Sequence, residues 1–219
     1  MDKIDLLYDH YKKSNELSRE AQSRRNRHFV FLCCLEAVSF WILIRPESAF
    51  SSLLSGIYAA LGTLLELGNT TIQTLVWILV VYILIRYCQD TLYVERQYKY
   101  LDKMEKAISE ELNSSLFDRE GSNYLNDYPL VLNFIDLFYK MLMPIIFFII
   151  NIVRIVQEWH VFDHVTLALL CDTIMFLAAS VIIWFYFFEI HNKITTWCKK
   201  HIPLVDKIAI WLRKILKEV

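Results

Sequence analysis

The stretch Ile72–Ile85 reads IQTLVWILVVYILI, and the chain continues at once with RYCQDTLYVERQYKYLDKMEKAI over residues 86–108. The first part carries no charge, the second is crowded with charge and tyrosine, and neither proline nor glycine separates them. Proline and glycine are the residues that most often mark the end of a helix. The sequence therefore predicts one helix of roughly 40 residues, about 60 Å long, that passes from lipid into water.

The composition of the whole chain places this helix in a membrane protein. Of its 219 residues, 56% are hydrophobic and 21% are charged, which is too apolar for an ordinary soluble domain. Four apolar segments stand out, at 29–44, 72–85, 130–153 and 165–190. A helix needs about 20 apolar residues to cross a bilayer. We predict an all-α membrane protein with four transmembrane helices, the second continuing into a cytoplasmic helical module, with a soluble helical bundle as the alternative.

The lysines and arginines alternate in number along the chain. Seven precede the first span, one lies in the first loop, six follow the second span, one lies in the third loop and seven follow the fourth span. An excess of such residues marks cytoplasmic loops. Both termini and residues 86–129 should therefore face the cytoplasm, as in a multi-pass protein of a bacterial inner membrane.

These spans divide the chain into five predicted parts. In order they are an N-terminal cytoplasmic amphipathic helix at 1–28, spans one and two at 29–85 with an outer loop at 45–71, a cytoplasmic helical extension and loop at 86–129, spans three and four at 130–190 with an outer loop at 154–164, and a basic amphipathic tail at 191–219. The tail either packs on the cytoplasmic module or lies on the anionic inner leaflet.

The charged continuation of the second span also carries an apolar stripe, which runs through Leu101, Met104 and Ile108 at helical spacing. Such a stripe must be buried against another helix. The N-terminal helix and the tail are both able to cover it. The stripe is also a natural contact between subunits, so we predict that these three residues support a homo-oligomer.

Charged residues inside the apolar segments are the sharpest functional signal. They are Glu36 in the first span, Asp136 and Lys140 in the third, and Asp172 in the fourth. Each costs about 2.5–3.5 kcal/mol at mid-membrane on insertion scales, so each needs a partner or water. They form either a structural ion pair, with Lys140 meeting Asp136 or Glu36, or a polar path for ions. Pro144 is expected to kink the third span.

Aromatic and basic residues gather on the predicted cytoplasmic side. The candidate ligand-binding residues are Arg24, Arg25, Arg27, Tyr93, Arg96, Lys99 and Lys103. Rings that stack and cations that pair with phosphate are the combination that holds nucleotides and short single strands. The alternative is an interfacial aromatic belt with basic flanks. Such a belt accounts less well for residues 96–103, which lie about 15–25 Å along the helix from the membrane.

No motif of a known enzyme class appears in the chain. With four glycines in all, a phosphate-cradling loop is nearly excluded. His160 and His164 lie four residues apart beside acidic residues, but two such histidines are usually interfacial polar groups rather than metal ligands. We therefore expect no catalytic residues, no metal and no cofactor.

The stretch LYVERQYKYLDKMEKAI at 92–108, together with a small multi-span bundle and a helical sensor, resembles the membrane effectors of bacterial anti-phage systems, such as the oligonucleotide-gated channel of the Hailong system. The resemblance covers the architecture of the whole chain and transfers no site residue. It implies an oligomeric ion channel or pore that opens on a nucleotide or oligonucleotide made by a partner enzyme and disrupts the membrane potential. Two alternatives remain, a non-conducting anchor or scaffold for a cytoplasmic partner and a small transporter subunit.

Overall fold

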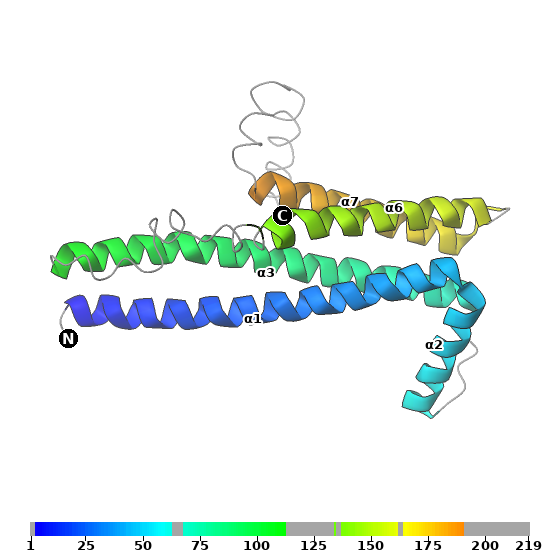
Figure 1. Cartoon of the computed structure of the whole chain (residues 1–219), viewed down its shortest axis with the longest axis horizontal. Helices are drawn as coiled ribbons and strands as arrows, with labels where there is room; N and C mark the ends of the chain where they lie inside the picture. The colour runs from blue at the N-terminus through cyan, green and yellow to red at the C-terminus, as the bar shows by residue number, and fades with distance from the viewer. Residues whose placement is uncertain (1–2, 63–67, 113–133, 135–136, 162–163, 191–219) are drawn as a thin grey trace, which may run out of the picture. The chain divides into compact units, whose positions relative to one another are not determined.

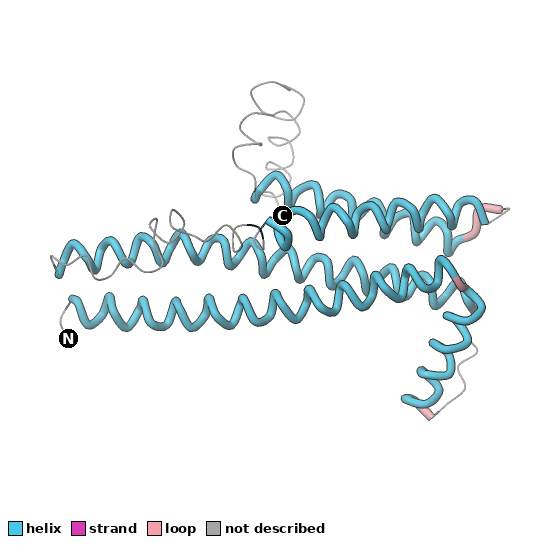
Figure 2. The backbone as a smooth tube through the Cα atoms, in the orientation of Figure 1, coloured by secondary structure: helices cyan, strands magenta, loops and turns pink. Residues whose placement is uncertain are grey.

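The computed structural model describes residues 3–62, 68–112, 134, 137–161 and 164–190, and every element in that part of the chain is helical (Figures 1 and 2). The elements are α1 (Lys3–Ile44), α2 (Pro46–Leu61), α3 (Asn69–Leu112), the π-helix η1 (Phe138–Leu142), α6 (Met143–Val161) and α7 (Leu167–Ile190). The chain forms two compact units, Met1–Ile183 and Trp184–Val219. The contacts below belong to the first unit. Asp136 and the amphipathic tail lie outside the described residues.

Four helices are long and apolar enough to cross a membrane, which supports the predicted class of a four-span membrane protein. They are Ile4–Ile44, Asn69–Leu112, Phe138–Val161 and Leu167–Phe188, and between 22% and 44% of the residues in their apolar windows are buried. Large apolar side chains such as Phe31, Ile149 and Ile174 are more than half exposed. An apolar outer surface of this extent is suited to lipid rather than to water.

The first two long helices do not break where their composition changes. The continuous helix predicted from Ile72 onward is observed as the 44-residue α3. On the N-terminal side, the predicted amphipathic helix at 1–28 and the first span are a single 42-residue helix, α1. At 1.5 Å per residue each helix is about 65 Å long, twice the thickness of a hydrocarbon core.

The predicted outer loop at 45–71 contains a helix of its own. Pro46 begins α2 in the first turn, where the missing N–H of proline costs no hydrogen bond. Gly62 ends it with φ 67°, and the Gly62 N–H donates to the carbonyl of Tyr58 at 2.8 Å. This left-handed conformation is easily adopted by glycine, so α2 stops there and the second span begins afresh at Asn69.

The most extensive packing joins α1 and α3, which run side by side in opposite directions (Figure 1). We call residues 3–28 of α1 and 86–112 of α3 the polar helix pair. Inside it Leu101, Met104 and Ile108 are 0%, 6% and 2% exposed. The N-terminal helix thus covers the stripe within one chain. The subunit contact predicted for these three residues would require the pair to open.

The third long helix begins irregularly. The π-helix η1 ends where the Met143 N–H donates to the carbonyl of Phe138, one residue further back than in an α-helix. Pro144 follows as the second residue of α6. A proline has no N–H and its ring clashes with the carbonyl four residues earlier, and the wide π-turn accommodates both features. The π-turn thus stands directly before Pro144, the residue at which a kink was predicted.

Candidate functional site

A buried arginine joins three of the apolar helices. The Arg154 side chain on α6 is 2% exposed, and all three of its nitrogens donate. Nε donates to Glu158 Oε1 at 3.0 Å, one terminal nitrogen to Ser39 Oγ on α1 at 2.8 Å, and the other to the carbonyl oxygen of Gln73 on α3 at 3.0 Å. The guanidinium also lies 4.2 Å from the ring centre of Trp77. Arg154 therefore connects α1, α3 and α6 at one point.

Glu158 and Trp77 complete the arginine's surroundings. The indole Nε1 of Trp77 on α3 donates to Glu158 Oε1 at 2.9 Å, the same oxygen that Arg154 binds. Trp77 is fully buried and its ring meets Phe176 of α7 edge to face. A charge in an apolar interior is tolerated when it is paired and hydrogen-bonded, and Arg154 meets both conditions.

Glu36 enters the same region from α1. Its Oε1 accepts a hydrogen bond from Asn151 Nδ2 at 2.7 Å, and that amide nitrogen also donates to the carbonyl of Phe147 at 2.7 Å. The Glu36 side chain is buried, at 3% exposed. The carboxyl group lies within electrostatic range of Arg154 without a direct hydrogen bond from it.

Asp172 supplies a third acid from α7. It is 2% exposed, and it too lies within electrostatic range of Arg154. We call the eight residues that meet here the buried cluster: Glu36, Ser39, Gln73, Trp77, Asn151, Arg154, Glu158 and Asp172. Its carboxyl groups outnumber its guanidinium three to one.

Several acceptor atoms of the buried cluster have no hydrogen-bond partner. They are Glu36 Oε2, Asn151 Oδ1, Glu158 Oε2 and Asp172 Oδ1. An unpaired buried acceptor costs about 1–3 kcal/mol, so four of them in one place are a departure from the usual rule that buried polar atoms are satisfied. Thr74 and Gln73 of α3 lie close enough to Asp172 to donate to it, so the shortage of donors concerns the other three atoms.

One member of the buried cluster on each long helix lies at a similar distance from a helix end. Glu36, Trp77, Arg154 and Asp172 are each five to eight residues from the end of their helix at the α1–α2, α2–α3 or α6–α7 connection. At 1.5 Å per residue this is about 8–12 Å inside those ends. The first part of the predicted outer loop at 154–164 is helical, because α6 continues to Val161 and contains Arg154.

The structure separates Lys140 from Glu36, one of its two predicted partners. Its Nζ pairs with Glu95 of α3. Lys140 precedes Asn151 by eleven residues, which places it about 16 Å along the helix from the residue that Glu36 contacts. Its predicted pairing with Asp136 concerns a residue outside the described part of the chain.

Sequence reasoning missed the central residues of the buried cluster. Asn151, Arg154 and Glu158 are spaced three and four apart, so they form a polar stripe on one helical face of an otherwise apolar segment. That periodicity was the available signal. The charge of Arg154 was instead taken to end the span. Ser39 and the Gln73 carbonyl, which make an internal arginine tolerable, give no sequence signal.

The seven candidate ligand-binding residues do not form one group. Arg24 lies 3.6 Å from Asp90, which His28 Nδ1 also contacts at 2.7 Å. Arg24, Arg25 and Arg27 thus lie near the end of the polar helix pair that adjoins the apolar helices. The others, Tyr93, Arg96, Lys99 and Lys103, are exposed on α3 and extend away from that end. We call these four residues the basic face.

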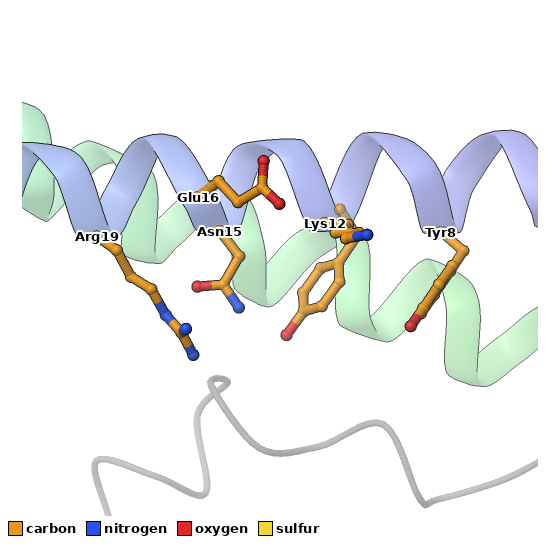
Figure 3. A pocket seen from close by; sticks show the side chains of 6 residues that line it. Tyr8, Lys12, Asn15, Glu16 and Arg19 are labelled. Carbon is orange, nitrogen blue, oxygen red and sulfur yellow. The ribbon is translucent and has the colours of Figure 1, made fainter.

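A groove that the sequence did not indicate lies on α1 (Figure 3). It has a volume of about 250 Å³ and is lined by Tyr8, Tyr11, Lys12, Asn15, Glu16 and Arg19. Figure 3 shows Tyr8, Asn15 and Arg19 extending from the same side of the helix. Tyr11 is held by a hydrogen bond from its hydroxyl to Glu105 of α3 at 2.8 Å. Two cations and two phenol rings suit an anionic aromatic ligand, while Glu16 opposes it.

Comparison with known proteins adds nothing to this geometry, because no family model, curated protein or solved structure matches the chain. Among the described residues, no group of three histidine, cysteine or acidic side chains has the arrangement of a metal site.

Proposed function

We propose that this chain is a subunit of a gated cation pathway across a membrane. Four helices cross the bilayer, and the polar helix pair and both termini face the cytoplasm. The observation that carries the proposal is the buried cluster, in which three carboxyl groups surround one guanidinium inside an apolar bundle.

A structural role alone would not require so many acids. One carboxylate, Glu158, already pairs with Arg154 at 3.0 Å. Glu36 and Asp172 each add about 2.5–3.5 kcal/mol of insertion cost, so their retention calls for a use. Acidic side chains line the pathways of cation channels, where they replace part of the hydration shell of the ion. The unpartnered oxygens of the cluster are suited to that task.

The long helices provide a mechanical link between the cytoplasm and the buried cluster. Glu36 and Ser39 belong to α1, and Gln73 and Trp77 belong to α3. Because both helices are unbroken, a small shift or rotation of the polar helix pair must move these side chains relative to Arg154. Packed helices switch between discrete arrangements rather than deforming gradually. The closed arrangement would be the one in which Arg154 holds all its partners.

The signal would bind to the polar helix pair. The basic face offers a tyrosine and three cations, and the groove on α1 offers two more cations beside two rings. A nucleotide or short oligonucleotide made by a partner enzyme matches both surfaces, in line with the resemblance to anti-phage effectors. Opening would then dissipate the membrane potential. Because side chains fill the interior of one four-helix bundle, a conducting path would require several copies around an axis.

Reconstitution into liposomes tests the proposal. A voltage-sensitive dye should report depolarisation when a panel of cyclic and linear oligonucleotides is added, and the reversal potential under a salt gradient should show preference for cations. Glu36→Gln should weaken that preference. Glu47→Gln is the matched control, because Glu47 is an exposed acid on α2 outside the buried cluster. If no oligonucleotide causes ion flux, in cells as well as in liposomes, the proposal is wrong.

One observation favours a second candidate, a non-conducting anchor or scaffold. Glu36 contacts Asn151 and Glu158 contacts Arg154 within a single chain, as expected if the cluster only fastens the helices together. The mass of the complex in detergent separates the two candidates. A monomer without flux supports the scaffold, whereas an oligomer with cation flux supports the pathway.

A further inference from the structure

The contact between Glu36 and Asn151 leaves one oxygen of the carboxyl group and the oxygen of the amide without a hydrogen bond. Asn151 Nδ2 donates to Glu36 Oε1 and to the Phe147 carbonyl, both at 2.7 Å. These two acceptors fix the orientation of the amide, because the opposite orientation would turn its oxygen toward both of them. Glu36 Oε2 and Asn151 Oδ1 then have no partner, although both residues are at least 97% buried.

One proton would satisfy both atoms. A carboxylic acid and a carboxamide are complementary, since the amide N–H donates to the acid's carbonyl oxygen and the acid O–H donates to the amide oxygen. We propose that Glu36 is a proton-binding site, in which the protonated carboxyl group forms this two-hydrogen-bond ring with Asn151 in the closed bundle. A small rotation of the Glu36 carboxyl group completes the second bond.

The charged surroundings support a neutral Glu36. On α6 it faces Arg154, but the three nitrogens of that guanidinium already donate to Glu158, Ser39 and Gln73. On its own helix the nearby titratable group is Cys33. On α7, Asp172 lies near Arg154 and competes for the same positive charge. The residues that α3 contributes, Gln73 and Trp77, carry no charge. Among the described residues, Arg154 is the cation that acts on Glu36, and its single charge is shared with two other acids.

The inference deepens the proposed function and rests on it in one respect, which is what happens on opening. When water enters the cluster, the Glu36 O–H bond breaks, the proton passes to water and the electron pair stays on the carboxylate. The carboxylate is then available to a passing cation. Because the closed state binds one proton more than the open state, raising the pH should shift the equilibrium toward opening.

Infrared spectroscopy of the full chain in liposomes tests proton binding without reference to conduction. Difference spectra between two pH values should contain the C=O band of a buried protonated carboxyl group. The band should shift when glutamate is labelled with carbon-13 and stay in place when aspartate is labelled. Glu36→Gln should remove it, and Asn151→Leu should shift it because the hydrogen bond from the amide is lost. Asp172→Asn, at a buried acid of the same cluster, should keep a glutamate band but move its titration to lower pH, because it removes an acid that competes with Glu36 for Arg154. Glu47→Gln, at an exposed acid on α2, is the matched control and should leave the band unchanged.

Two results would overturn the inference. The first is the absence of a glutamate band in the isotope-labelled wild type, an arm that uses no substitution and so does not depend on a variant folding. The second is a band replaced, on adding sodium or potassium, by carboxylate bands, which would make this a cation site. A glutamate band that Glu36→Gln removes, in a chain that never conducts, rules out the pathway and keeps the proton site. Conduction in a chain that shows no glutamate band keeps the pathway and rules out the proton site.

Discussion

The polar helix pair continues into an apolar bundle, by which we mean residues 29–44 of α1, 69–85 of α3, α6 and residues 167–183 of α7. The two regions have opposite interiors. In the pair, α1 and α3 bury apolar side chains such as Leu101 and Ile108 and expose charge. In the bundle, the same helices expose large apolar side chains such as Phe31 and Leu79, and they bury the polar cluster around Glu36 and Trp77. The inversion occurs within single unbroken helices.

The inversion shows that the kind of interaction that holds helices together depends on the solvent around them. In water, burial of apolar area drives the helices together. In lipid that drive vanishes, because the surroundings are as apolar as the side chains, and hydrogen bonds and ion pairs between helices take its place. Substitutions should therefore have different consequences in the two regions, and the same chemical change can be compared between them.

The largest expected effect is in the bundle. Arg154→Met removes three hydrogen bonds and leaves the Glu158 carboxylate buried without a cation. Removing one partner of a buried ion pair costs about 3–5 kcal/mol, because the remaining charge is uncompensated. We expect this loss in the free energy of unfolding, measured in detergent by tryptophan fluorescence against increasing denaturant.

Two further variants sharpen that measurement. Arg45→Met removes an arginine that is exposed between α1 and α2, and it should change stability by less than about 0.5 kcal/mol. Combining Arg154→Met with Glu158→Gln should recover much of the loss, since the orphaned charge is removed as well. A double variant no more stable than Arg154→Met would mean that the arginine acts through packing instead of charge.

The next effect concerns the polar helix pair. Leu101→Ala opens a cavity at a fully buried position, and we expect a cost of about 3 kcal/mol from lost apolar burial and incomplete collapse. Leu6→Ala, at a position that is 60% exposed on α1, is the control and should cost little. Hydrogen exchange of α1 and α3 would localise the loss. If exchange accelerates in the apolar helices as much as in the pair, the two regions are not separately stabilised.

A smaller effect is expected at the boundary between the regions. Asp90 is 7% exposed and binds His28 Nδ1 at 2.7 Å, with Arg24 at 3.6 Å. Asp90→Ala should cost about 2 kcal/mol, which is typical of a lost hydrogen bond to a charged group. The Asp102→Ala variant removes an exposed i,i+4 pair with Lys106 and should cost under about 0.5 kcal/mol. If a denaturant titration gives Asp90→Ala and Asp102→Ala the same loss in the free energy of unfolding, burial of Asp90 does not strengthen its contacts.

The fold was largely predictable from the sequence because apolar runs and their length are local properties. The absence of glycine and proline between Ile72 and Ile108 correctly predicted an unbroken α3. Glu36 and Asp172 were predicted to be intramembrane acids because each lies in an apolar run, and both are buried within the helices. The helical spacing of Asn151, Arg154 and Glu158 indicated a polar face on the third span. The prediction did not use it, because the charge of Arg154 was taken as the end of the apolar segment.

Partners in space were not predictable in the same way. The sequence offered Lys140 two partners, Asp136 on its own helix and Glu36 by depth. The structure pairs it with Glu95, because α3 continues past the apolar segment and brings a carboxylate to the same level. The contact of Glu36 with Asn151 spans 115 residues of sequence. Such pairings depend on helix rotation and on the register between helices, which no local pattern specifies.

The smallest effect on stability, and the most informative for function, is expected on the basic face. Changing Arg96, Lys99 and Lys103 together to glutamine alters exposed side chains only, so the free energy of unfolding should change by no more than about 0.5 kcal/mol per site. A charge-assisted contact to phosphate is worth about 1.5–3 kcal/mol, so a ligand held there should lose at least about a hundredfold in affinity. The readout is oligonucleotide-triggered depolarisation in liposomes beside thermal unfolding of the same preparation.

The variant Lys12→Gln with Arg19→Gln tests the groove on α1 in the same assay, and Arg45→Gln at the other end of α1 is the common control. Activation lost in the triple variant alone places the sensor on the basic face, and activation lost in the double variant alone places it in the groove. If both respond to oligonucleotide like the wild type, neither surface is the sensor, and the polar helix pair serves only to hold α1 against α3.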